Sequence, residues 1–195
     1  MRQRIARLTS SILNPFLVSF ITVILLSWNA TNSLADALKW TAIALVLSVL
    51  PVFAFVVYQV RRRRLDSIFP ETQGQRNKIY ILATFVGAAG CGVLWAFDAP
   101  ELLTITFTAG LAAIIIFMSI NFYWKISLHT AFIAAAATVL TLVFGVQVAW
   151  VFVLLPLVAW ARLELKMHTP AQVAAGAALA AAIVTGMMWG FGVVG

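Results

Sequence analysis

The sequence predicts an all-α fold, a bundle of helices that span a membrane. Of its 195 residues 63% are hydrophobic, only 10% are charged, and the mean hydropathy is +1.02. A soluble core of this size cannot bury so much apolar surface, so we expect the bilayer to serve as its solvent. The apolar runs do not alternate with period two between turns, and a transmembrane barrel is therefore not expected.

Seven apolar runs approach the roughly 20 residues that a helix needs to cross the hydrocarbon core. The sixth run is short, and only Asp98–Glu101 separates the third from the fourth, so a count of six stays open beside seven. No soluble domain stands out, and we expect one integral membrane domain over residues 1–195. The expected spans are 11–29, 37–60, 78–97, 101–123, 128–145, 147–161 and 172–193.

The first run has a second interpretation. It follows a basic start, "MRQRIAR", and ends near the small residues of "NSLADA", as a signal peptide does. Its apolar stretch is long for the hydrophobic part of such a peptide, so we favour a membrane span.

The single cysteine, Cys91, lies in an apolar run without metal-ligand spacing. We therefore expect neither a disulfide nor cysteine chemistry.

The basic residues orient the predicted bundle. With seven spans, twelve of the thirteen lysines and arginines fall on one face, and only Lys39 falls on the other. The positive-inside rule places the basic face, and with it the N-terminus, in the cytoplasm. We expect the inner or plasma membrane of a bacterium or archaeon. The formal charge of +7 does not indicate nucleic acid, because the basic residues flank apolar segments.

The same face collects the unusual polar stretches, "RRRRLDSIFPETQGQRNK", "YWKISLHTAF" and "WARLELKMHTPAQVAAG". The last two contain the only histidines, His129 and His168, each at the mouth of a predicted span. A lone histidine or arginine there is more often an interfacial residue or a headgroup anchor. Two histidines, a serine and several cations on one face of so apolar a chain favour a functional site.

This set of side chains suits a phosphate ester. Arginine and lysine neutralise the nonbridging oxygens and stabilise the charge that develops during transfer. A neutral histidine can attack phosphorus while a protonated one donates to the leaving oxygen. The sequence has no acidic pair or Cys/His spacing typical of a metal site. We expect neither a metal nor a cofactor.

Two of the stretches resemble motifs of the type 2 phosphatidic acid phosphatase superfamily, whose members are integral membrane enzymes. Ile126–His129, "ISLH", is similar to its Pro-Ser-Gly-His motif. Arg162, five residues, His168, three residues and Gln172 resemble Ser-Arg-x5-His-x3-Asp, with glutamine in place of the aspartate. The first family motif, Lys-x6-Arg-Pro, is the weakest match, with Phe69 for the lysine and Arg76–Asn77 for Arg-Pro.

The resemblance implies a role for each matched residue. His168 would be the nucleophile that forms a phosphohistidine, and His129 the acid that protonates the leaving oxygen. Arg162 and Arg76 would bind the phosphoryl oxygens, and Ser127 would add hydrogen bonds. The family's fold implies a helical bundle that gathers these motifs at one membrane face.

Two departures from the family pattern change what is expected. In the family the aspartate orients the nucleophilic histidine and stabilises its cationic form, much as in a serine protease triad. Gln172 could accept a hydrogen bond from the imidazole but brings no negative charge. The lysine missing at Phe69 could be replaced in phosphate binding by Lys78, by Lys125 or by one of Arg61 to Arg64.

Four nearby residues have structural interpretations. Pro170 suits the first turn of the last span, with Thr169 as its N-cap, so that His168 lies at a helix N-terminus that favours anions. Gly176 is expected to let helices pack closely, and Asn77 to cap the third span.

From the residues and the resemblance together we expect a metal-independent phosphatase at the cytoplasmic interface. Its substrate would keep an apolar tail in the bilayer, as an isoprenoid diphosphate or phosphatidic acid does. The alternative is a noncatalytic membrane scaffold or lipid-binding relative that lost turnover, favoured by Phe69 and Gln172. A small transporter is less favoured, because the span interiors carry few charges. The sequence leaves the oligomeric state open.

Overall fold

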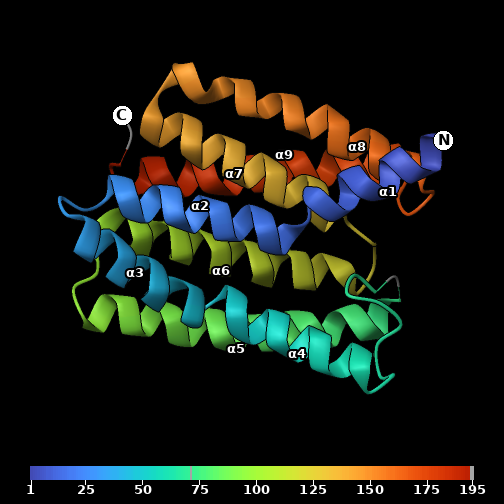
Figure 1. Cartoon of the computed structure of the whole chain (residues 1–195), viewed down its shortest axis with the longest axis horizontal. Helices are drawn as coiled ribbons and strands as arrows, with labels where there is room; N and C mark the ends of the chain where they lie inside the picture. Colours follow the sequence, from blue (N-terminus) through green and yellow to red (C-terminus); the bar gives the residue numbers. More distant parts are fainter. Residues whose placement is uncertain (71, 194–195) are drawn as a thin grey trace. The chain divides into compact units, whose positions relative to one another are not determined.

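The protein is described here by a computed structural model, which covers residues 1–70 and 72–193. Every regular element in that part of the chain is a helix, so the predicted all-α class is confirmed (Figure 1). The elements are α1 (Arg2–Ile12), α2 (Pro15–Asn29), α3 (Leu34–Val46), α4 (Val49–Arg61), α5 (Gln73–Ala96), α6 (Glu101–Asn121), α7 (Leu128–Phe144), the 3-10 helix η1 (Val146–Val153), α8 (Leu154–Glu164) and α9 (Pro170–Gly190).

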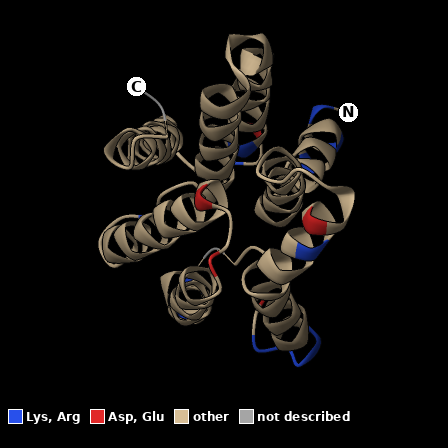
Figure 2. Ribbon diagram, turned by 90° about the vertical axis from the view of Figure 1, so that its left-hand side faces the viewer, with Lys and Arg blue, Asp and Glu red and all other residues tan. Residues whose placement is uncertain are grey.

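Five helical stretches in the described residues are long and apolar enough to cross a membrane, and α1 with α2 would make a sixth. In each of the five, only 17–28% of the most apolar 18-residue segment is buried inside the protein. Most of the helical ribbon carries neither basic nor acidic residues (Figure 2). Lipid must cover the remainder, which indicates an integral membrane protein. By length and composition the helices support five or six spans and not the seven counted in the sequence, because α7, with 17 residues, falls just short. The five stretches are Leu34–Arg61, α5, α6, Val146–Glu164 and α9.

The predicted starts of the first and third spans differ most from the structure. The first helix begins at Arg2, and the chain bends by 41° between α1 and α2. The cause is Pro15, which lacks an amide hydrogen and disfavours the helical conformation at Asn14. The third predicted span, 78–97, begins instead at Gln73. Arg76 and Lys78 therefore lie inside α5 and not in the loop before it.

The described residues form two compact units, with the boundary inside α2. The first unit combines Met1–Thr22 with Lys125–Gly195. At its centre lies α7, ten of whose 17 residues are buried, and α9, η1 and α8 pack around it (Figure 1). Helix α1 packs against α8. Since α7 is apolar and largely covered by protein, it behaves as a core helix of this unit.

The second unit, Val23–Trp124, is built on the α5–α6 hairpin, with α4 packed on α5 and α3 on α4. The hairpin turns at Asp98, which adopts a left-handed φ of 48° and closes the helix end by a 3.0 Å bond from the Ala99 amide to the Leu94 carbonyl. The tight turn expected at Asp98–Glu101 is thus confirmed. A Cβ at Gly90 would lie 2.7 Å from the Leu47 carbonyl oxygen, so glycine permits close packing there.

Asn77 does not cap the third span, and that prediction is wrong. The N-cap of α5 is Thr72, and Asn77 lies one turn inside the helix. Its Oδ1 accepts a 2.7 Å hydrogen bond from Nδ2 of Asn121, a fully buried residue at the end of α6. Asn77 therefore joins two membrane helices, a task that small polar side chains perform well in apolar surroundings.

Candidate anion site

Three helix ends meet in the first unit around the two motifs that carry the histidines. The amide of Ser127, just before α7, donates a 3.2 Å hydrogen bond to the Gln172 carbonyl in the first turn of α9. Thr130 Oγ1 donates to the Val173 carbonyl at 3.0 Å. A Cβ at Gly176 would lie 2.5 Å from the Ser127 carbonyl oxygen, so the expected packing role of this glycine is confirmed. The two helix starts are therefore held side by side.

The connection from α8 to α9 has a defined geometry. The Lys166 amide donates to the Leu163 carbonyl at 2.9 Å, and the Met167 amide donates to the Arg162 carbonyl at 3.1 Å. These are the two bonds of a Schellman motif, and Lys166 takes its left-handed position with φ of 54°. This turn has no sequence signal, because glycine usually occupies that position. The motif brings the chain round so that His168 immediately precedes α9.

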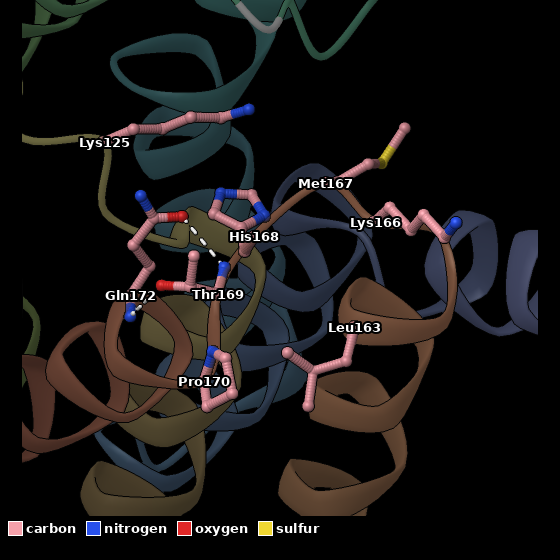
Figure 3. A pocket seen from close by; sticks show the side chains of 8 residues that line it. All are labelled: Lys125, Leu163, Lys166, Met167, His168, Thr169, Pro170 and Gln172. Atoms are coloured by element: carbon pink, nitrogen blue, oxygen red, sulfur yellow. Dashed lines mark hydrogen bonds between the residues drawn. The ribbon is translucent and has the colours of Figure 1, made fainter.

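Helix α9 begins with a capping box. Thr169 is its N-cap and Pro170 lies in the first turn, so both predictions are confirmed. Oγ1 of Thr169 accepts from the Gln172 amide at 3.3 Å, and Oε1 of Gln172 accepts from the Thr169 amide at 3.1 Å (Figure 3). The side-chain carbonyl of Gln172 was expected to accept a hydrogen bond from the imidazole of His168. It instead accepts one from the N-cap amide of α9.

The cluster of His129, Arg162 and His168 lies where the three helix ends meet. His129, in the first turn of α7, is 3% exposed, and Arg162, in the last turn of α8, is 4% exposed. His129 interacts electrostatically with both Arg162 and His168. His168 is half-buried and lies nearer the surface. The structure thus brings His129 close to both Arg162 and His168.

Ser10 in α1 is a member of this site that the sequence did not reveal. Nη1 of Arg162 donates a 2.9 Å hydrogen bond to its Oγ, and His129 forms a hydrogen bond to its backbone. The carbonyls in the last turn of a helix have no partner inside it. Because α1 ends before Asn14, Ser10 can offer its backbone to His129. The pair Asn14–Pro15 was the available signal, since it predicts the break that ends α1.

An open pocket of about 610 Å³ lies beside His168. None of the eight described residues that line it is acidic, and the N-terminus of α9 opens onto it. Lys125 extends along the edge occupied by His168, whereas Lys166 points away (Figure 3). Cationic side chains and a helix N-terminus together favour an anion. The lining residues are Lys125, Leu163, Lys166, Met167, His168, Thr169, Pro170 and Gln172.

Ser127 lies at the start of α7, and its side chain is fully buried. Its hydroxyl does not cap the helix, and no residue in the described part of the chain forms a hydrogen bond with it. Buried hydroxyls normally have a partner, and an exception calls for an explanation. A ligand that enters beside α7 is one partner that would satisfy it.

Arg76 and Lys78 belong to the second unit. Arg76 is buried, and its Nη2 donates to the hydroxyl of Tyr80 at 3.2 Å, one turn further along α5. Its guanidinium also lies 5.8 Å from the centre of the Tyr80 ring. Lys78 is exposed, and Phe69, in the loop before α5, is half-buried. The first unit contains the other six predicted site residues, namely His129, His168, Gln172, Arg162, Ser127 and Lys125.

Among the described residues, no three histidine, cysteine or acidic side chains lie close enough together to hold a metal ion. A scan against protein-family models found no match, and searches of curated proteins and of solved structures found no chain similar to this one.

Proposed function

We propose that the protein is a membrane phosphatase that hydrolyses a lipid phosphate or isoprenoid diphosphate at the pocket beside His168. The observation that carries the proposal is the cluster of His129, Arg162 and His168 behind a pocket that Lys125 borders and whose lining has no acid. Such surroundings favour a phosphoryl group over a neutral or cationic ligand. The resemblance to the type 2 phosphatidic acid phosphatase motifs supports the same chemistry.

The reaction would proceed in two steps. A ring nitrogen of His168 attacks phosphorus, the bond from phosphorus to the leaving oxygen breaks, and His129 gives that oxygen a proton. Water then attacks the phosphohistidine and gives a proton to His129, the bond from phosphorus to nitrogen breaks, and inorganic phosphate leaves with both histidines restored. The guanidinium of Arg162 stabilises the charge on the phosphoryl oxygens, with help from Lys125 and the N-terminus of α9.

The substrate would be a lipid because the site belongs to an apolar bundle. Three residues of the pocket lining are apolar, namely Leu163, Met167 and Pro170. An apolar tail can remain in the hydrocarbon while the phosphate reaches the cations, so little polar surface needs to leave water. Phosphatidic acid and an isoprenoid diphosphate both meet this description.

The charge distribution supports a cytoplasmic site. All lysines and arginines of the first unit lie in α1 or beside the helix ends that form the site. In the second unit, six of the seven lie from Arg61 to Lys78, where α4 ends and α5 begins. We therefore propose that the N-terminus faces the cytoplasm of a bacterium or archaeon.

Impermeant maleimide should label Lys125→Cys, in a Cys91→Ser background, only after cells are opened. Labelling of intact cells would contradict this orientation.

The proposal is tested by phosphate release from purified protein. Phosphatidic acid and an isoprenoid diphosphate would be supplied in mixed micelles with EDTA, and inorganic phosphate measured over time. We expect release by the wild type and a loss of at least about 10³-fold in His168→Ala, since removal of a nucleophile abolishes the covalent route. Lys166→Ala is the matched control, because this pocket lysine points away from His168 (Figure 3).

Two outcomes would contradict the phosphatase. Equal release by the wild type and His168→Ala would show that His168 is not the nucleophile. No release by the wild type from any lipid phosphate, with the substrate still bound, would favour the second candidate below.

The second candidate is a noncatalytic protein that binds lipid phosphates. The observation in its favour is Gln172, whose carbonyl belongs to the capping box and which brings no negative charge to His168. Without an acid, the cationic form of a nucleophilic histidine loses a source of stabilisation. Gln172→Asp separates the candidates, because it would raise the rate of a slow enzyme and leave a pure binding protein without turnover.

A further inference from the structure

The first helix, α1, carries an apolar line that nothing in the described structure covers. Ile5, Leu8 and Ile12 are 48%, 62% and 52% exposed. Their spacing of three and four residues places them along one side of the helix. We propose that this line docks into the headgroup layer of an anionic lipid leaflet. The proposal is independent of the phosphatase activity.

The opposite side of α1 is fixed to the protein. Ala6 and Ser10 are buried at 0% and 7% exposure, α1 packs against α8, and Ser10 accepts the hydrogen bond from Arg162. Because this side is held, the helix cannot turn its apolar line inward. The line must therefore meet whatever surrounds the first unit at this point.

The charges of α1 match an anionic surface. The helix has three exposed arginines, Arg2, Arg4 and Arg7, and no acidic residue. At about 100° per residue, Arg4 lies to one side of the apolar line and Arg2 to the other. Arginine can bury its aliphatic stem beside such a line and leave its guanidinium among the lipid phosphates. Each basic residue near an anionic membrane contributes attraction that salt screens.

The neighbouring sequence identifies the partner as lipid. After the bend at Asn14, α1 continues into α2, an apolar helix without a charged residue. A surface that leads directly into a membrane helix lies at the level of the headgroups. A second copy of the chain is disfavoured at this face, because the arginines of two α1 helices would repel each other.

The test uses the full chain with Cys91→Ser and a single cysteine at Leu8, labelled with an environment-sensitive fluorophore. The control carries the label at Gln3, an exposed residue on another side of α1. Both proteins are placed singly in nanodiscs of phosphatidylcholine, with or without phosphatidylglycerol. We expect the Leu8 label to shift to shorter wavelength and to be quenched by lipid-borne nitroxide but not by aqueous acrylamide. The Gln3 label should show the reverse.

The three arginines of α1 lead to a second expected result. The protection of the Leu8 label should be greater with phosphatidylglycerol, and high salt or the double substitution Arg2→Gln and Arg4→Gln should remove the difference. Equal acrylamide quenching at Leu8 and Gln3 would overturn the proposal. Protection at Leu8 without quenching by the lipid-borne nitroxide would overturn it as well, because protein would then cover the line.

Discussion

Arg162 donates a 2.9 Å hydrogen bond from Nη1 to Oγ of Ser10, across 152 positions of the chain, and both side chains are buried. The contact makes α1 a structural part of the candidate site, because the backbone of the same serine binds His129. A guanidinium in the membrane region is costly without partners. Ser10 therefore supports the residue proposed to hold the phosphoryl group and orients the residue proposed to protonate the leaving oxygen.

Ser10→Ala should destabilise the protein by about 1.5 to 3 kcal/mol, the usual cost of losing a hydrogen bond to a buried charge. The measurement is unfolding of the purified protein in detergent. Ser11→Ala is the control, since Ser11 is exposed on the same helix. If both variants unfold like the wild type, the bond to Arg162 has no structural weight.

Gly176→Ala should separate the starts of α7 and α9, because the new Cβ would lie 2.5 Å from the Ser127 carbonyl oxygen. Overpacking of this kind costs about 1 to 3 kcal/mol, and phosphate release should fall with it. Gly186→Ala in the same helix meets nothing within 4 Å, and it should be neutral or stabilise the helix by up to about 1 kcal/mol. Equal stability of the two variants would refute the close approach at Gly176.

The left-handed turn at Lys166 can be tested by its side-chain preference. Lys166→Gly should stabilise the protein by about 1 kcal/mol, since glycine adopts this conformation without strain, whereas Lys166→Val should destabilise it. Lys166→Ala removes the charge but keeps a Cβ, and it is the control. Thermal unfolding of the three variants measures the order. A valine variant as stable as the glycine variant would contradict the φ of 54°.

The hydrogen bond between Asn77 and Asn121 is suited to a double-mutant cycle. Substitution of either residue by leucine should destabilise the α5–α6 hairpin, and the double variant should lose less than the sum. The expected coupling is about 0.6 to 1.7 kcal/mol, the range for polar pairs between membrane helices. Unfolding in mixed micelles gives the four stabilities. Strict additivity would mean that the two amides do not interact.

Hydropathy and the turn and cap residues predicted much of the fold, because the length of an apolar run and the residues at its ends determine where a helix forms. The cap at Thr169, the turn at Asp98 and the packing at Gly176 all follow from such local rules. The start of α5 was missed, because its first turn is polar, "QGQRNK", and its helical form does not depend on hydropathy. The number of spans was not predicted either, because α7 is apolar but short, and it is buried by packing against the other helices of its unit.

For the site, the predicted topology placed His129, Arg162 and His168 on one membrane face, and their electrostatic interactions show that they lie close together. The contacts between segments that are distant in the chain could not be predicted from the sequence. The spacing of Thr169 and Gln172 is the local signature of a capping box, but nothing local to Ser10 indicates Arg162 as its partner. Such contacts depend on how helices pack, which residue spacing does not encode.

The most direct test of the proposed function is to trap the phosphoenzyme. Purified protein would be mixed with a lipid phosphate labelled with radioactive phosphorus, quenched in base, and digested for mass spectrometry. The account predicts a phosphoryl group on His168 that is stable to base and labile to acid, and that is absent from His168→Ala but present in Lys166→Ala. Phosphate release by the wild type with no label on His168 would contradict it.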